Sequence, residues 1–433
     1  MKYDEAIEYM ESLQVRGIHP GLEGIKGLCD ALGNPEKDLK IIQVVGTNGK
    51  GSVSRFLFNI LCSAGYRVGL YTSPKVFEER EIIRVNGRNI SAADYADLTE
   101  RIGKINTCGA TRFETETAMA LLYFREKKCD LVILEAGLGG KLDSTNISST
   151  NVLSVITPIG FDHMGILGPT IRDIAANKAG VIKPGSRCVS AFQVKDAETV
   201  IRKTCEDLKV PVTFVDPSSI KASFSLKGTT FSYKSFKKVK TVLLGNYQPE
   251  NAALSMEAAL ALREEGFKIS DRDICDGILK TTESGRFEKI GDKPLFFIDG
   301  AHNEPAAVRL KECIETYFTN REIVIIMGMF KDKDCERVAE LIAPCARALV
   351  TVASPNRERT LSAFEMAETV KKYNTNVSAA DSPEEAVELA YLMAGNSGVI
   401  LACGSLSILA GIKAAAAGFK NKKDFHGVRF NDR

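Results

Sequence analysis

The segment Gly46-Thr47-Asn48-Gly49-Lys50-Gly51-Ser52 has the residue types and the spacing to bind a phosphate group. It follows the apolar run 41–45, which predicts a buried strand, and precedes the apolar-periodic run 53–64, which predicts a helix. In that arrangement backbone N–H groups and the positive end of the helix dipole face an anion, and Lys50 adds a full charge. The usual pattern is G-x-x-x-x-G-K-[ST], whereas here the first glycine is missing and the hydroxyl comes one position late, at Ser52. We therefore expect a phosphate-binding loop of irregular form, with a structural glycine turn as the alternative.

Polar side chains follow three further predicted strands, at 66–71, 130–135 and 152–156. Glu135 ends the second of these, and because an unpaired buried carboxylate is costly it needs a cation, for which Mg²⁺ is the natural choice beside phosphates. Ser73 could offer a hydroxyl to Mg²⁺, although on its own a plain turn is the better interpretation. His163, beside Asp162, is equally open to a ligand or acid–base role and to a structural one. Since parallel strands end at a common edge of the sheet, these side chains are predicted to gather there.

Two series of alternating strands and helices divide the chain. Continuous apolar strands separated by helices predict, in the first series, a parallel sheet covered on both faces. A second series begins after Gly285 and has no phosphate loop of its own; its strands are expected at 295–298, 322–327, 348–352 and 399–403. Short alternating runs at 220–243 predict a hairpin between the two series. The expected fold is α/β, with a P-loop parallel-sheet ATPase domain at residues 1–285 and a smaller Rossmann-like α/β domain at residues 286–433.

The second series carries its own polar cluster, Asp299-Gly300-Ala301-His302-Asn303, at the end of its first predicted strand. Arg286 lies just upstream, where it could reach phosphates bound by the first domain or form an interdomain salt bridge. The polar end of the chain, residues 422–433, is expected to be loosely ordered.

Composition excludes several classes of protein. The 433 residues carry a net charge of +2, which is too small a positive surplus for an electrostatic nucleic-acid binder. The start of the chain is acidic and amphipathic, unlike a signal peptide, and no apolar run reaches membrane-spanning length. Eleven cysteines without a C-x-x-C pair fit reduced thiols. We expect a cytoplasmic protein that binds neither nucleic acid nor membrane.

The chain resembles the folylpolyglutamate synthase/dihydrofolate synthase branch of the Mur ligase superfamily. The motifs that carry the resemblance occur in family order over nearly the whole chain: Gly46 to Ser52, Thr72-Ser73-Pro74, Arg84-Val85-Asn86-Gly87, Glu135-Ala136-Gly137-Leu138-Gly139-Gly140, Leu142-Asp143-Ser144-Thr145-Asn146, Phe161-Asp162-His163, Lys178-Ala179-Gly180, Asp299-Gly300-Ala301-His302-Asn303 and Cys403-Gly404-Ser405-Leu406. The late hydroxyl at Ser52 is itself a hallmark of the branch. The sequence departs from the family at Lys75, Asn177, Tyr247 and Glu283-Ser284-Gly285, which puts adenine packing and substrate preference in doubt.

The resemblance implies an ATP-dependent ligase that adds L-glutamate to a folate, or to dihydropteroate, through an acyl phosphate. It implies a catalytic set of Lys50, Glu135, His163, Lys178 and His302, and ATP contacts from Gly46, Thr47, Asn48, Gly49, Lys50, Gly51, Ser52, Asn251, Arg286 and Asp299. Phe113, Glu114, Leu142, Asp143 and Ser144 would lie near the pterin, and His302 and Ser405 near the incoming glutamate. Two Mg²⁺ ions would be held by Ser73, Glu135, His163 and a carbamylated Lys178. From the residues alone, Lys178 only complements a helix dipole. The family resemblance also favours a monomer.

Three alternatives stay open or are disfavoured. A Mur-type ligase acting on a nucleotide-linked cell-wall precursor is disfavoured by the Lys-Gly-Ser loop and by the Asp299 to Asn303 cluster. A nucleotide-binding homologue without ligase chemistry is disfavoured because every candidate metal and phosphate ligand is present. A P-loop GTPase is weaker still, since no Asn-Lys-x-Asp guanine motif follows the loop at a suitable strand end. The choice between dihydropteroate and tetrahydrofolate as acceptor, and the length of any glutamate tail, remain open.

Overall fold

The computed structural model describes residues 1–17, 21–107, 109–355 and 359–426. The chain forms two compact units. The first comprises Met1–Ser223, Thr229–Val242 and Gln248–Thr282, and the second comprises Phe224–Gly228, Leu243–Tyr247 and Glu283–Arg433. The sequence places one boundary between residues 285 and 286, whereas the main division falls after Thr282 and two short segments near residues 224–247 also join the second unit. A single linear boundary cannot express this interleaving.

The strands of the first unit are β1 (Ile41–Val45), β2 (Val68–Tyr71), β3 (Ile83–Val85), β4 (Arg88–Asn89), β5 (Leu131–Glu135), β6 (Leu153–Ile156), β7 (Arg187–Ser190) and β8 (Val212–Phe214). They form one sheet in the order β4-β3-β2-β5-β1-β6-β7-β8. In the part of the sheet that runs β2-β5-β1-β6-β7-β8, all neighbouring strands are parallel. The β2–β3 and β3–β4 pairs are antiparallel. The predicted parallel sheet is therefore confirmed. The sequence does not predict β3, β4, β7 or β8, and β4 is only two residues long, too short to show a period.

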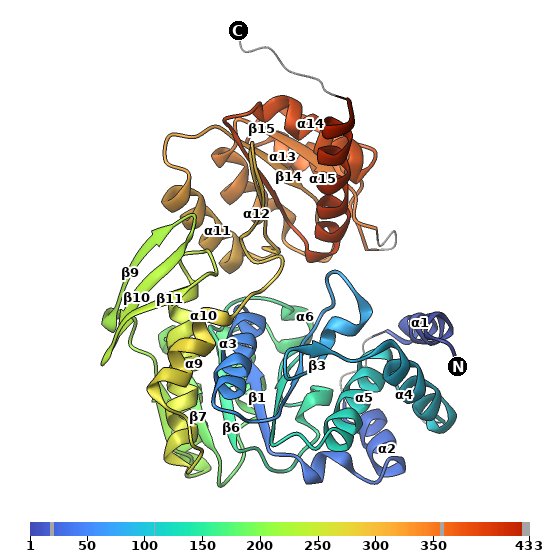
Figure 1. The fold of residues 1–433 in the computed structure, drawn as a ribbon, viewed down its shortest axis with the longest axis vertical. Coiled ribbons are helices and arrows are strands. Elements are labelled where there is room, and N and C mark those ends of the chain that lie inside the picture. Colours follow the sequence, from blue (N-terminus) through green and yellow to red (C-terminus); the bar gives the residue numbers. More distant parts are fainter. Residues whose placement is uncertain (18–20, 108, 356–358, 427–433) are drawn as a thin grey trace. The chain divides into compact units, whose positions relative to one another are not determined.

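The helices of the first unit are α1 (Tyr3–Ser12), α2 (Glu23–Ala31), α3 (Lys50–Ser63), α4 (Ala92–Ile105), α5 (Arg112–Glu126), α6 (Met164–Leu167), α7 (Ile171–Ala179), α8 (Lys195–Asp207), α9 (Gln248–Glu264) and α10 (Asp271–Lys280). Helices α3, α9 and α10 pack on one another, and α3 and α9 lie against β1, β2 and β6 (Figure 1). A separate apolar cluster joins α1, α2, α4 and α5 to Ile41, Val132 and Leu134. Helices α7 and α8 pack with Val45 and Ile156. Both faces of the sheet are thus covered.

The predicted hairpin is a three-stranded sheet in the order β11-β10-β9, built from β9 (Ile220–Ser225), β10 (Gly228–Tyr233) and β11 (Phe236–Thr241). Glu257 on α9 is 5% exposed and accepts a hydrogen bond from Tyr233 Oη at 2.8 Å. The Lys234 ammonium lies 2.5 Å from the same carboxylate. A charge-assisted contact of this kind, close to the tight turn between β10 and β11, anchors the hairpin to α9 within the first unit.

The strands of the second unit are β12 (Glu288–Asp292), β13 (Leu295–Ile298), β14 (Ile323–Met327), β15 (Ala348–Val352), β16 (Val377–Ala380) and β17 (Val399–Cys403). They form a sheet in the order β12-β13-β17-β14-β15-β16, antiparallel for β12–β13 and parallel elsewhere. Its helices are α11 (Glu304–Tyr317), α12 (Cys335–Ile342), α13 (Ala363–Lys371), α14 (Pro383–Ala394) and α15 (Leu406–His426). This confirms the expected second α/β series.

The end of the chain differs from its prediction. Helix α15 runs to His426, so the described part of the segment predicted to be loosely ordered is helical. Residues 427–433 of that segment lie outside the described residues. Over the described ranges, none of the helices combines the length and the apolar character needed to cross a membrane.

Candidate active site

The phosphate loop connects β1 directly to α3, because the helix begins at Lys50 and not at residue 53 as predicted. Gly46 and Gly49 have φ values of +148° and +87°, a region that L side chains rarely adopt. A Cβ atom on Gly46 would lie 1.8 Å from Thr157 Oγ1, and one on Gly49 would lie 2.7 Å from Asn251 Oδ1. Both glycines are therefore required by backbone angle and by space. The alternative of a glycine turn with only a structural role does not explain the lysines described next.

Two lysines meet at one carbonyl of this loop. Lys50 Nζ donates hydrogen bonds to the Gly46 and Thr47 carbonyl oxygens, each at 3.2 Å. Lys178 Nζ, from the last turn of α7, donates to the same Gly46 oxygen at 2.7 Å. Lys178 is 4% exposed, and burial together with the charge of Lys50 lowers its pKa to about 7. Lys178 thus does more than complement a helix dipole, since its nitrogen lies at the phosphate loop.

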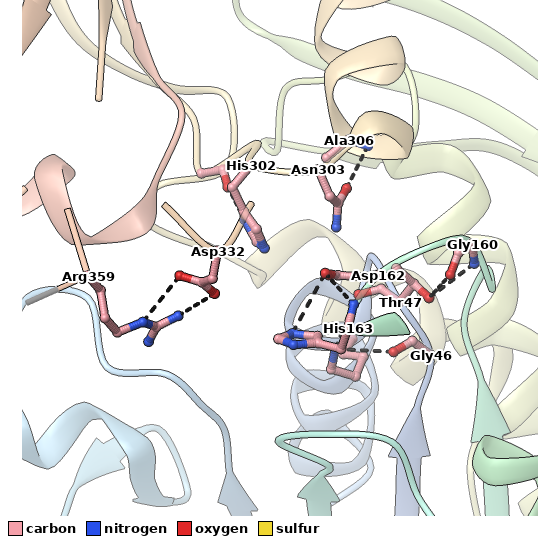
Figure 2. A network of polar contacts seen from close by, with 12 residues as sticks. Gly46, Thr47, Gly160, Asp162, His163, His302, Asn303, Ala306, Asp332 and Arg359 are labelled. Carbon is pink, nitrogen blue, oxygen red and sulfur yellow. Dashed lines mark hydrogen bonds and ion pairs between the residues drawn. The ribbon is translucent and has the colours of Figure 1, made fainter. Parts of the chain in front are cut away.

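The loop that follows β6 is hydrogen-bonded to the phosphate loop. Thr47 N donates to the Pro158 carbonyl at 2.9 Å, and Thr47 Oγ1 exchanges hydrogen bonds of 3.0 Å with the backbone of Gly160. Figure 2 shows this contact beside Asp162 and His163. His163 has a φ of +51°, and its ring nitrogen Nε2 lies 3.8 Å from Asp162 Oδ1. Its side chain is about one-third exposed, so a ligand can reach the ring.

Three of the four groups predicted to bind metal lie at the carboxyl ends of β2, β5 and β6, and Lys178 is the fourth. Glu135 ends β5, is 4% exposed, and stands in register with Val44 on β1. Ser73 follows β2, whose last residue, Tyr71, pairs with Leu134 on β5. His163 follows β6, on the other side of β1. The structure therefore brings Ser73, Glu135 and His163 to the edge of the sheet that carries the phosphate loop. Among the residues that the structure describes, no group of three or more His, Cys, Asp or Glu side chains could hold a metal ion by itself.

The residues predicted to lie near the pterin have unequal surroundings. Phe113 packs with Tyr71 at a ring-centroid distance of 6.0 Å, and Leu142 is 46% exposed. Glu114 is buried and has structural partners: it accepts from Thr111 N at 2.8 Å at the start of α5 and from Ile25 N of α2 at 3.1 Å. These contacts give Glu114 a capping role, and its place in a substrate site stays a prediction.

Asp143 holds the loop that follows β5. It accepts from Leu138 N at 2.7 Å and from Thr145 N at 3.0 Å, and burial raises its pKa. Thr145 Oγ1 in turn accepts a 2.7 Å hydrogen bond from Gln43, a fully buried side chain on β1. Ser144 is buried in the same turn. Sequence reasoning missed Gln43, although a glutamine inside an otherwise apolar strand is a visible signal.

In the second unit, Asp299 follows β13 and organises the turn that carries His302. It is 5% exposed and accepts from Ala301 N and from Phe287 N, each at 2.8 Å. Tyr247 Oη lies 3.3 Å from it. Burial raises the pKa of Asp299 and the nearby Arg286 charge opposes that rise. Tyr247, noted in the sequence only as a departure from the family, is thus one of the groups that hold this carboxylate.

Arg286 lies beside the same turn. A Cβ atom on Gly300 would come within 2.6 Å of Arg286 Nη1, so the absence of a side chain at Gly300 makes room for the guanidinium. Arg286 Nε lies 3.9 Å from Glu283 Oε1, a partner in the same unit. Of the two expectations for Arg286, phosphate binding and an interdomain salt bridge, neither is tested by these contacts.

His302 and Ser405 lie at the carboxyl edge of the second sheet. His302 Nδ1 is 2.8 Å from the Gly300 carbonyl, which can only accept, so Nδ1 carries the proton and Nε2 is the acceptor in the neutral ring. Ser405 Oγ is 2.7 Å from Ser407 Oγ, which is 2.7 Å from Ser354 Oγ. Sequence reasoning missed Ser354 and Ser407, because this hydroxyl chain joins two segments that are distant in sequence.

Comparison with known proteins places these features in a family. Residues 44–259 match the Mur ligase middle domain, and residues 285–406 match the Mur ligase, glutamate ligase domain. The dihydrofolate synthase/folylpolyglutamate synthase of Bacillus subtilis is 34% identical over 428 residues, which cover 95% of this chain and 98% of that protein.

Solved structures of similar proteins also match this chain over nearly its whole length. A Mycobacterium tuberculosis folylpolyglutamate synthase complexed with ADP and AMPPCP is 26% identical and superposes with a TM-score of 0.86, covering 99% of this chain and 100% of that one. An Escherichia coli protein described as FolC in complex with DHPP and ADP is 28% identical, with a TM-score of 0.84 and coverage of 98% and 99%. The chain belongs to the Mur ligase family, in its folylpolyglutamate synthase/dihydrofolate synthase branch.

Proposed function

We propose that this protein is an ATP-dependent ligase that joins L-glutamate to a carboxyl group of its acceptor through an acyl phosphate. The two candidate acceptor groups are the γ-carboxyl of tetrahydrofolate and the benzoate carboxyl of dihydropteroate. The observation that carries the proposal is the convergence of Lys50 and Lys178 on the Gly46 carbonyl, inside a glycine loop that opens a helix. Such a loop binds phosphate with backbone N–H groups and positive charge. Names and complexes of the relatives support the choice of ATP and a folate.

The residues at the loop also fit Mg²⁺. Glu135 is a buried carboxylate next to the phosphate loop, and Ser73 adds a hydroxyl oxygen at the same edge. A bound Mg²⁺ ion needs only one or two protein ligands, because it keeps several of its waters and is also coordinated by the phosphates of the substrate. We propose two sites, one held by Ser73 and Glu135 and a second approached by Glu135 and His163, with a carbamylated Lys178 as a further anionic ligand. Bound there, Mg²⁺ would neutralise phosphate charge during transfer.

The first half of the reaction then needs positioning more than a covalent nucleophile. Lys50 and the loop backbone hold the phosphates of ATP, and the oxygen of the acceptor carboxylate attacks the γ-phosphorus. The bond from that phosphorus to the β–γ bridging oxygen breaks, ADP leaves, and an acyl phosphate remains. Fixed donors aimed at the growing charge on the phosphate oxygens supply the stabilisation.

The second half uses L-glutamate, which we propose binds at the carboxyl edge of the second sheet. His302 Nε2 can accept a proton from the glutamate ammonium, because Nδ1 already donates to Gly300. The free amine attacks the acyl carbon and the C–N bond forms, the C–O bond to phosphate breaks, and inorganic phosphate leaves with the second proton that the nitrogen loses. Ser405 would contact the same amino acid. Asp299 positions His302 through the Ala301 backbone, and a direct contact with ATP remains part of the proposal for Asp299 and Arg286, as adenine contact does for Asn251.

Lys178 is proposed to be carbamylated. Its neutral amine attacks CO₂, a C–N bond forms, and a proton is lost, which leaves an anionic carbamate. A pKa of about 7 supports this, since a large fraction of the amine is neutral at physiological pH. The carbamate would also replace the buried positive charge of Lys178, which lies beside the positive charge of Lys50, with a negative charge. Nuclear magnetic resonance with isotope-labelled bicarbonate would detect the carbamate, and a spectrum without it at saturating bicarbonate would contradict the assignment.

One assay tests the function as a whole: ADP release with tetrahydrofolate or dihydropteroate, each with and without L-glutamate. Glutamate-dependent ADP release and a product one glutamate heavier are expected. No turnover with either acceptor would favour the inactive homologue, and turnover only with a nucleotide-linked cell-wall precursor would favour the other Mur-type ligase. Comparing the two acceptors side by side decides between dihydrofolate synthesis, chain extension and both.

We further propose that the protein is a cytoplasmic monomer. The ten cysteines that the structure describes are free thiols, which agrees with a reducing compartment. Light scattering after size-exclusion chromatography would measure the mass, and a dimer at micromolar concentration would contradict the monomer.

A further inference from the structure

Strands β14 and β15 carry an arginine–carboxylate pair at each of their two ends. At the amino ends, Arg347 pairs with Glu322, and both side chains are more than half exposed. At the carboxyl ends, Arg359 pairs with Asp332. The two pairs share the same strands, and each joins an arginine to a carboxylate, so a comparison shows what the position on the sheet adds.

The carboxyl-end pair is held in a fixed geometry. Arg359 donates from Nη2 to Asp332 Oδ2 at 2.8 Å and from Nε to Oδ1 at 3.3 Å. Its guanidinium carbon lies 4.6 Å from the centroid of the Phe330 ring. Lys331 N also donates to the Arg359 carbonyl at 2.7 Å, which joins the two loops. A guanidinium held by an aromatic ring and bonded to a carboxylate through two nitrogens is an ordered receptor for a planar anion.

This receptor shares its edge of the sheet with His302 and Ser405. Residues after β13, β17, β14 and β15 follow one another along the carboxyl edge, in the order of the sheet. Gly404 N donates to the Ala301 carbonyl at 2.9 Å, and Gly328 N donates to the Cys403 carbonyl at 3.3 Å, so the loops are joined in sequence. Figure 2 shows His302, Asp332 and Arg359 in one view. The side chains of Arg359 and Asp332 are 49% and 46% exposed, which leaves them within reach of a small ligand.

We propose that Arg359 binds the side-chain carboxylate of the incoming L-glutamate, and that Asp332 occupies the guanidinium until the substrate displaces it. This inference rests on the proposed function. A carboxylate matches the guanidinium fork through two parallel hydrogen bonds, whereas the amide of glutamine offers one acceptor and an opposed N–H group. Arg359 would therefore set the choice of glutamate over glutamine, while His302 acts on the amine at the other end of the molecule.

The test compares Arg359→Gln with Arg347→Gln, the matched change at the opposite end of the same strands. Amide formation is measured with saturating ATP and acceptor over a range of L-glutamate, and again with L-glutamine. For Arg359→Gln we expect a KM for glutamate raised about tenfold to a hundredfold, the usual effect of losing a charged hydrogen bond. We also expect an unchanged KM for ATP and a reduced preference for glutamate over glutamine. Arg347→Gln should match the unmodified enzyme in all three.

Two further variants separate recognition from loop structure. Asp332→Asn keeps the shape of the pair but removes the competing charge, so it should leave the KM for glutamate equal or lower. Arg359→Lys keeps the charge and should restore part of the preference for glutamate. If Asp332→Asn is as damaging as Arg359→Gln, or if Arg359→Gln lowers the rates with glutamate and glutamine equally, the pair is structural and the inference is wrong.

The unmodified enzyme keeps the two proposals apart. If it shows no glutamate-dependent ADP release, the proposed function fails before Arg359 is tested. If it is active with glutamate and the Arg359→Gln variant keeps the full preference over glutamine, only the role of Arg359 fails.

Discussion

The two sheets use their carboxyl edges in different ways. In the first unit, the proposed anion site is made of backbone, with two lysine nitrogens converging on the Gly46 carbonyl. In the second unit, the edge presents side chains with directional groups: the His302 ring, the hydroxyls of Ser354, Ser405 and Ser407, and the Arg359 guanidinium. A backbone loop suits a phosphate chain, which every nucleotide shares, whereas side chains can tell one amino acid from another. Losses in the first unit should therefore stop all turnover, and losses in the second should mainly change affinity and selectivity.

The largest effect is expected from Glu135→Gln. The change keeps the shape of a side chain that is 4% exposed but removes the charge proposed to hold Mg²⁺. We expect ADP release to fall by about a thousandfold, as when several kcal/mol of charge stabilisation are lost. The measurement is ADP release at saturating substrates, and its control is an unchanged melting temperature. Full turnover would contradict the metal role.

Lys178→Met should come next, with a loss of about a hundredfold if a carbamate supplies part of the charge stabilisation. In the unmodified enzyme, activity should depend on bicarbonate and should rise as the pH increases through about 7. The sign follows from the chemistry, because the ammonium form below that pKa cannot attack CO₂ and the neutral form above it can. A rate that is flat between pH 6 and pH 8 and indifferent to bicarbonate would remove the carbamate from the mechanism.

His302→Asn tests the second unit. We expect the KM for glutamate to rise and the rate to fall by about tenfold to a hundredfold, in the range of a lost general base. Binding of ATP should be unchanged, because His302 is not among the residues proposed to contact ATP. Calorimetric titration with a non-hydrolysable ATP analogue provides that control. If the variant loses nucleotide binding as well, the division of labour between the two units is wrong.

The difference between a backbone loop and a set of separate side chains also explains which site residues could be predicted from the sequence. The phosphate loop could be predicted because its glycines, its lysine and its flanking strand and helix are contiguous. Glu135 could also be singled out, since it is a carboxylate that ends an apolar strand, whereas Ser73, two residues after a strand, was better interpreted on its own as part of a turn. The hydroxyl chain from Ser354 to Ser405 and the pair of Asp332 with Arg359 could not be predicted, because their partners come from different strand ends and only the strand order brings them together.

In the first unit, the position of Lys178 at the phosphate loop could not be predicted from the sequence pattern. Its position at the end of a helix predicts no more than a dipole contact, and only the packing of α7 beside the phosphate loop brings its nitrogen to Gly46. The resemblance to a known family singled it out, whereas its composition and spacing did not. Asp299 shows a different limit: it follows a strand, as a ligand would, and two of its partners are backbone N–H groups of its own unit. Its contact with ATP stays a prediction.

The smallest predicted effect concerns Tyr247, which holds Asp299 by a 3.3 Å hydrogen bond. Tyr247→Phe removes the hydroxyl and leaves the two backbone donors in place, so Asp299 stays bonded. We expect a loss of about 0.5–1.5 kcal/mol in the free energy of unfolding, the usual net contribution of one hydrogen bond. We also expect a change of less than about threefold in the KM for glutamate, since less than 0.7 kcal/mol should reach His302 through the turn. Denaturant unfolding and glutamate titration measure the two quantities. A large rise in KM without a loss of stability would show that Tyr247 contacts substrate, and the second unit would then recognise its ligand through the segment Leu243–Tyr247 as well as through the edge of its sheet.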